Sequence, residues 1–285
     1  MKGKEGRGFV TFAQNSADVD YLRLAYAQAM NVKCLHPGAK YAVIVDEATA
    51  ATVTERNRKV FDHVILLQKN PDIDPSWKMA HEYQIFNLTP FSETIKLESD
   101  LLFTRSIDHW WAAFALRDLV LSTGCKTYRH EKALSRAYRK FFDDNHLPDV
   151  YNGIMYFRIK RFSAQFFMTA ERIVRSWEYL KNHTLKNCRE DEPSTDVLYA
   201  ITASVMGVEQ CTLPTMDFIN FIHMKSRIQN WNNGERPWFD AVMSERDGDM
   251  MRVNNLNQYD PVHYYSKSYI TEEILNDFER RLRID

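Results

Sequence analysis

The chain has 285 residues, of which 45% are hydrophobic and 13% aromatic, enough to bury the core of one large domain. Its 37 basic and 38 acidic residues nearly cancel, which excludes recruitment to nucleic acid or anionic membrane by overall charge. No run of about 18 apolar residues and no signal-peptide pattern is present, so we expect a cytoplasmic protein without a membrane span.

The first hundred residues alternate short apolar strands with helical segments. The first helix is expected to be capped by Asn15 or Ser16, because polar side chains there can accept the free backbone N–H groups. Such alternation is typical of βαβ units, and it predicts an α/β fold with a mostly parallel central sheet flanked by helices. The expected strands cover residues 8–13, 41–45, 63–67 and 92–103, and the expected helices cover 17–32, 48–59 and 75–88.

After Cys125 the pattern is less regular, but it contains no internal repeat and no flexible linker. We therefore predict one domain over residues 1–285. Its expected later elements are a strand at 153–157 and helices at 130–142, 163–181, 197–204 and 271–283.

Two carboxylates stand one residue apart at the end of the strand predicted over 92–103. Glu98 and Asp100 share a face of an extended chain, and a bend at the strand end lets both reach one cation. Mostly apolar residues flank the pair, and buried carboxylates are costly unless something neutralises them. Oxygen ligands of this kind favour Mg²⁺ or Mn²⁺, ions that usually hold a substrate diphosphate.

Ligands of open α/β sheets bind beyond the carboxyl ends of the strands. Residues 11–15, Asp46 and the carboxylate pair would meet at that edge. No Gly-x-Gly-x-x-Gly or P-loop pattern is present, which argues against a dinucleotide-binding enzyme and a Walker-type ATPase.

The residues around the carboxylate pair resemble a segment of a known protein family. The run from Trp77 to Asp108, with Lys78, Leu88-Thr89 and Leu97-Glu-Ser-Asp, resembles the "K…LT.Y..VVYLDAD.LV…ID" segment of glycogenin-like glycosyltransferases, the family 8-like enzymes with the GT-A fold. This resemblance implies a nucleotide-diphosphate sugar donor, usually UDP-linked, bound through a divalent cation. Glu98 stands where the family has the first Asp, which adds one methylene to that ligand.

Three later segments extend the resemblance in the same order. Tyr151–Phe162 is similar to the "NSGVMLFN..R" segment that shapes the sugar pocket, and Glu192–Tyr199 looks like the "DQD.LN" segment near the reacting carbon, with Ser194 and Thr195 in place of the acid and the amide. Asn220–Arg227 resembles the segment that supplies the third metal ligand, which would be His223, and Arg236-Pro-Trp is similar to the family's "KPW".

The resemblance implies a set of site residues and a division of the single domain. Residues 8–108 would form the nucleotide-binding half, 109–240 the acceptor and sugar half, and 241–285 a C-terminal extension. It also implies retention of configuration at the transferred sugar. The implied roles are catalysis by Asp196, Thr195 and Asn152, donor binding by Thr11, Ala13, Asn15, Lys78, Glu98, Ser99 and Lys225, and Mn²⁺ or Mg²⁺ binding by Glu98, Asp100 and His223.

Structural roles compete with several of these assignments. His223 lies in an apolar run, as a core histidine does, and Asp196 could cap the helix that follows it. Lys78 could be a solvated residue at a helix start, and Asn152 could serve a turn.

The acceptor of the sugar is open. Basic residues alternate with aromatic residues between Lys126 and Lys140, followed by Arg158–Arg161, which suits a nucleic-acid acceptor such as a modified pyrimidine or else a solvated helix face. Protein side chains, saccharides and lipid-linked saccharides are the alternative acceptors. The competing function is a non-catalytic nucleotide-sugar-binding protein, and a nucleotidyltransferase is disfavoured because Thr11–Ser16 is not a Gly-rich basic loop.

Overall fold

The structure is a computed structural model, and it describes residues 4–74, 76–133, 139–214, 219–224, 243–264 and 266–284. In the first half of the chain its elements are β1 (Glu5–Ala13), α1 (Tyr21–Leu35), β2 (Tyr41–Val45), α2 (Glu47–Ala50), α3 (Glu55–Arg58), β3 (His63–Leu66), a 3₁₀ helix (Met79–Gln84), α4 (Ile85–Leu88), β4 (Phe91–Leu97), β5 (Leu101–Leu102), α5 (Trp110–Phe114) and β6 (Leu119–Ser122).

The second half continues with α6 (Lys140–Asp144), β7 (Tyr151–Arg158), α7 (Arg161–Arg175), α8 (Trp177–His183), α9 (Thr195–Met206) and a 3₁₀ helix (Val208–Gln210). It then forms β8 (Ile222–His223), β9 (Ser244–Asp247), β10 (Met250–Val253), β11 (Leu256–Gln258), β12 (Val262–His263), a 3₁₀ helix (Lys267–Tyr269) and α10 (Glu272–Leu282).

The central sheet has six strands in the order β3-β2-β1-β4-β7-β6. The first four run parallel to one another, whereas β7 runs antiparallel to both β4 and β6. The predicted α/β fold is confirmed, with a sheet that is mixed because of β7. Since β7 is antiparallel, it begins where β4 ends, with Ile154 opposite Leu97. The start of β7 therefore lies at the same edge as the carboxyl ends of β1 and β4.

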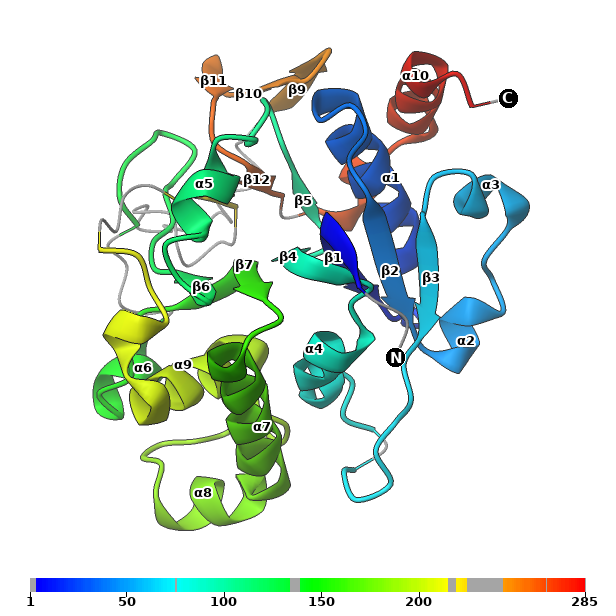
Figure 1. Cartoon of the computed structure of the whole chain (residues 1–285). Helices are drawn as coiled ribbons and strands as arrows, with labels where there is room; N and C mark the ends of the chain where they lie inside the picture. The colour runs from blue at the N-terminus through cyan, green and yellow to red at the C-terminus, as the bar shows by residue number, and fades with distance from the viewer. Residues whose placement is uncertain are drawn as a thin grey trace.

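Helices cover both faces of this sheet and divide its core in two (Figure 1). On one face α1 packs against α10, and Met30 of α1 belongs to the same buried cluster as Ile95 of β4. On the other face lie α4, α7 and α9, where Phe166 and Trp177 share a buried cluster with Val10 of β1. The alternation of strand side chains explains the division, because successive residues point to opposite faces.

Two small sheets complete the fold. β9, β10 and β11 form an antiparallel sheet, and β12 lies between β5 and β8 in the other. β5 follows the Glu98–Asp100 turn directly, so its pairing with β12 brings the C-terminal part of the chain to the carboxylates.

The predicted helix over 17–32 forms, but it begins later than expected. Its N-cap is Asp20, whose side chain accepts from the Arg23 N–H at 3.0 Å, rather than Asn15 or Ser16. Asn15 still serves the helix start, because its Oδ1 accepts from the Leu22 N–H at 2.9 Å.

Three other predicted helices are shorter or broken. The helix expected over 48–59 divides into α2 and α3, because Thr54 and Asn57 form a capping box that starts a new helix. The helix expected over 163–181 divides into α7 and α8 at Ser176. The helix expected over 130–142 forms only at its end, where α6 begins at Lys140; at its start His130 has a φ of 63° and Lys132 forms a bridge with Lys126, and residues 134–138 lie outside the described ones.

The last predicted helix is confirmed as α10, with Thr271 as its N-cap. The stretch expected to be helical over 75–88 forms a 3₁₀ helix followed by the short α4. None of the helices in the described ranges is both long enough and apolar enough to cross a bilayer.

Candidate active site

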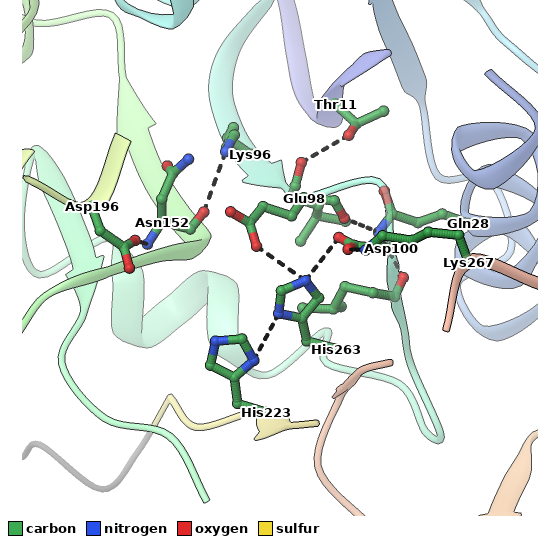
Figure 2. Close-up of polar contacts among 12 residues, drawn as sticks. Thr11, Gln28, Lys96, Glu98, Asp100, Asn152, Asp196, His223, His263 and Lys267 are labelled. Carbon is green, nitrogen blue, oxygen red and sulfur yellow. Dashed lines mark hydrogen bonds and ion pairs between the residues drawn. The ribbon is translucent and has the colours of Figure 1, made fainter. Parts of the chain in front are cut away.

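The two carboxylates predicted to bind metal lie in the turn between β4 and β5. The backbone of this turn is held on two sides, because the Glu98 N–H donates to the Gly153 carbonyl at 3.1 Å and Gln28 donates to the Glu98 carbonyl at 2.5 Å. Gln28 is itself fixed by the hydroxyl of Tyr41. Neighbouring strands and helices therefore fix the position from which both acidic side chains extend (Figure 2).

The imidazole of His263 completes the group from β12. Its Nε2 lies 2.9 Å from Asp100 Oδ1 and 3.3 Å from Glu98 Oε2. One ligand atom from each of the three residues lies within 4.8 Å of the others. Figure 2 shows Glu98 and Asp100 pointing toward the same edge of the His263 ring.

This group fits a divalent cation. Ligands about 2.1 Å from an octahedral ion are about 3 Å from one another when adjacent, which is close to the separations of His263 from the two carboxylates. Two carboxylates suit Mg²⁺ or Mn²⁺, and the imidazole moves the preference toward Mn²⁺, because Mg²⁺ strongly prefers oxygen and water. Glu98 reaches the group despite its extra methylene.

Asp100 is buried, with an exposed fraction of 7%. Burial alone would raise the pKa of its carboxyl, but the nearby His263 and Lys267 outweigh burial and hold that pKa well below its usual range. Lys267, from the 3₁₀ helix after β12, pairs with Asp100 Oδ2. The lowered pKa favours the anionic form of Asp100, which is the form that a metal ligand needs.

The structure places His223 behind His263 rather than beside the carboxylates. The two Nδ1 atoms lie 2.9 Å apart, and the rings stack with centroids 4.5 Å apart. A metal on Nε2 of His263 requires the proton on its Nδ1, which then donates to Nδ1 of His223. His223, which was predicted to be a metal ligand, therefore contacts the imidazole of His263, and it is His263 that faces the two carboxylates.

The sequence contained two similar candidates for this imidazole. Ile222-His223 and Val262-His263 are both buried apolar-His pairs, and they lie opposite each other on the parallel strands β8 and β12. The pairing of β12 with β5 decides between them, and it also brings Lys267, four residues after His263, to Asp100.

A His223→Phe variant is expected to weaken Mn²⁺ binding by about 10- to 100-fold, because Nδ1–H of His263 loses its acceptor. His223→Asn is the matched control, since its side-chain oxygen can occupy the position of Nδ1 and should restore most of the affinity. Isothermal titration of both variants with Mn²⁺ measures the effect. Equal affinity in His223→Phe and the wild type would refute the role of His223.

Glu98, Asp100 and His263 form a candidate metal-binding group, called the metal-binding group below. A cleft of about 370 Å³ opens in front of it. Of the residues predicted to bind the donor, Lys78, Glu98 and Ser99 line it. Thr11 and Ala13 are fully buried. Successive side chains along β1 and just after it point to opposite sides, so Phe12 and Gln14 line the cleft instead. The other lining residues are Tyr21, Met79, Glu82, Lys96, Leu97, Asp100, His263 and Lys267.

Asn15 and Lys78 connect two sides of this cleft. Lys78 Nζ donates to the Asn15 carbonyl at 2.9 Å, and Gln14 donates to the Lys78 carbonyl at 3.0 Å. The Asn15 N–H donates to Thr49 at 2.8 Å. In this structure Asn15 is a backbone anchor, while the ammonium of Lys78 remains at the cleft wall.

The predicted residues Asn152 and Asp196 lie together. Asp196 Oδ1 accepts from the Asn152 N–H at 2.6 Å (Figure 2), and its Oδ2 accepts from Arg139 at 3.2 Å. Thr195, the residue before Asp196 and the first of α9, is buried, with 6% of its surface exposed. The N-cap of α9 is Ser194, so the alternative role of Asp196 as a helix cap is not observed.

Two predicted features have a different outcome. Lys225 and Arg236-Pro-Trp lie outside the described residues. Four described members of the basic cluster pair with acids: Lys126 with Asp260, Arg129 with Glu131, Arg139 with Asp196 and Arg158 with Asp118. These pairs give no support to a nucleic-acid acceptor.

Scans against protein-family models and against curated proteins find no match for this chain. Solved structures do resemble it. The galactosyltransferase LgtC, in complex with donor and acceptor sugar analogs, matches with a TM-score of 0.56 at 12% identity, over 96% of this chain and 95% of its own. The apo form of mouse xyloside xylosyltransferase 1 matches with a TM-score of 0.52 at 9% identity, over 93% of this chain and 99% of its own.

The bifunctional glycosyltransferase WbbM matches all of this chain with 50% of its own length, at a TM-score of 0.52 and 11% identity. The chain therefore has the GT-A fold of glycosyltransferases.

Proposed function

We propose that this protein is a metal-dependent glycosyltransferase of the glycogenin-like type, which moves a sugar from a UDP-sugar to an acceptor hydroxyl. One observation carries the proposal: Glu98, Asp100 and His263 converge in a cleft at the carboxyl ends of β1 and β4. In open α/β sheets this edge is where ligands bind. The fold shared with glycosyltransferases supports the same assignment.

The residues suit the cleavage of a sugar–phosphate bond. A divalent cation held by Glu98, Asp100 and His263 would offset the negative charge that develops on the leaving diphosphate. Lys78 and Lys267 line the same cleft and can add positive charge there. Asn152 and Asp196, which are joined by a hydrogen bond, would position the sugar, with retention of configuration as the expected outcome.

A donor should stabilise the folded protein only when the metal is present. At about 100 times its dissociation constant a ligand adds about 2.7 kcal/mol, which is about 5 °C in Tm for a chain of this size. Thermal unfolding with UDP-glucose, UDP-galactose, UDP-N-acetylglucosamine and UDP-xylose, each with and without Mn²⁺, measures this. If none of these donors shifts Tm with Mn²⁺ present, the proposal is wrong.

The competing function, a nucleotide-sugar-binding protein without turnover, has a separate test. The wild type with Mn²⁺ should slowly hydrolyse the donor that stabilises it best, and chromatography detects the UDP released. Stabilisation without any UDP release, with or without a panel of saccharide acceptors, would favour the binding protein.

A further inference from the structure

A buried ion pair forms part of the cleft wall beside the metal-binding group. Lys96 lies on β4 with 1% of its surface exposed, and its Nζ is 3.0 Å from Oε2 of Glu82 in the 3₁₀ helix before α4. Both residues line the cleft together with Glu98 and Asp100. A charged pair at the centre of a sheet is costly to desolvate and adds little net stability. Its position in the cleft suggests a role toward a ligand.

The contacts of Glu82 fix one of its oxygens. Asn152 Nδ2 donates to Oε2 at 3.1 Å, so Lys96 and Asn152 both bind this oxygen. Lys96 also donates to the Asn152 carbonyl at 3.3 Å, which closes a ring of three residues (Figure 2 shows this last contact). Among the described residues, Oε1 of Glu82 makes no hydrogen bond.

This arrangement presents a hydrogen-bond acceptor to the cleft. The side chain of Glu82 is 13% exposed, and an ionised carboxylate oxygen can accept more than one hydrogen bond. The Lys96 charge balances the Glu82 charge, so the pair suits a neutral group that donates a hydrogen. Sugar hydroxyls are such groups.

We propose that Glu82 is a specificity-determining residue whose Oε1 accepts a hydrogen bond from a hydroxyl of the donor sugar, and that Lys96 and Asn152 are the positioning residues that hold it. This inference rests on the proposed function, and it assigns to Glu82 and Lys96 the recognition of the sugar rather than of the nucleotide.

A Glu82→Gln variant tests the assignment at the cleft-facing atom. Lys96 and Asn152 both donate to the Oε2 position, so the amide oxygen must take that place. The NH₂ group then replaces Oε1 and presents a donor where the sugar needs an acceptor. We expect the dissociation constant for the best UDP-sugar to rise about 10- to 100-fold, while that for UDP stays within about twofold of the wild type.

Isothermal titration with UDP and with UDP-glucose, UDP-galactose and UDP-xylose, all with Mn²⁺, provides the measurement. Asp62→Asn is the matched control, because Asp62 is also a carboxylate paired with lysines, with 15% of its side chain exposed, but it lies outside the cleft lining. If Glu82→Gln does not fold, the double variant Glu82→Gln/Lys96→Met removes both charges and carries the same comparison.

The outcomes separate the two proposals. A wild type that binds neither UDP nor any UDP-sugar overturns the proposed function and this inference with it. A wild type that binds them, with a Glu82→Gln variant that keeps the full gain of UDP-sugar over UDP, overturns only the role of Glu82. Equal weakening of UDP and UDP-sugar would show a merely structural residue and would overturn it as well.

Discussion

An Asp100→Asn variant is expected to lose about 10³-fold in kcat/KM for Mn²⁺-dependent hydrolysis of the best UDP-sugar. The amide keeps the size of the side chain but removes the anionic oxygen that faces Nε2 of His263 at 2.9 Å. Because Asp100 is the most deeply buried carboxylate of the metal-binding group, water cannot easily supply a replacement ligand. The affinity for Mn²⁺ should fall together with the rate, and isothermal titration and UDP release measure the two.

Asp249→Asn is a suitable control for this variant. Asp249 is also a partly buried carboxylate, paired with Arg281, and it does not line the cleft. Its variant should keep wild-type turnover. A fully active Asp100→Asn variant, or an inactive one with unchanged Mn²⁺ affinity, would show that Asp100 is not a metal ligand.

An Arg139→Ala variant is expected to lower the free energy of unfolding by about 3–5 kcal/mol. The guanidinium of Arg139 lies 3.7 Å from the ring centroid of Tyr151 and 4.2 Å from that of Phe142, and 2% of the residue is exposed. Its removal leaves a cavity between these rings and deprives Asp196 of its cation. Chemical denaturation of the purified variant measures the loss.

Two further variants distinguish the causes of that loss. Arg158→Ala removes a pair with Asp118 in which both side chains are about 30% exposed, so it should cost no more than about 1 kcal/mol. Arg139→Met combined with Asp196→Asn removes both charges and fills the space, and it should recover most of the stability. If Arg139→Ala is no less stable than Arg158→Ala, the buried pair is not a major contributor.

Local sequence patterns predicted five of the six strands of the central sheet and two of the three residues of the metal-binding group, but not β6 or the antiparallel direction of β7. Glu98 and Asp100 follow the predicted strand that became β4, and the end of this strand determines where they lie. Asn152 and Asp196 were assigned to one site only from the order of segments shared with a family, and the hydrogen bond between them was not predicted.

Local sequence patterns could not predict which strands far apart in the sequence pair with each other. His223 and His263 occur in similar buried pairs, and only the register of β12 beside β5 decides which imidazole meets the carboxylates. The ion pair of Lys96 was not predicted either, since its partner Glu82 comes from a different element. Helical periodicity likewise did not reveal the break at Ser176, because apolar residues continue at the same spacing through α8.

The place of β12 between β5 and β8 has a consequence for biosynthesis. A nascent chain that has emerged from the ribosome as far as Met224 already holds both carboxylates, yet it lacks the imidazole and the ammonium that complete the site. β12 must then insert between two strands made earlier, so Glu98, Asp100 and His263 come together late in folding. A translating ribosome therefore carries a chain whose central sheet can form well before these three residues meet.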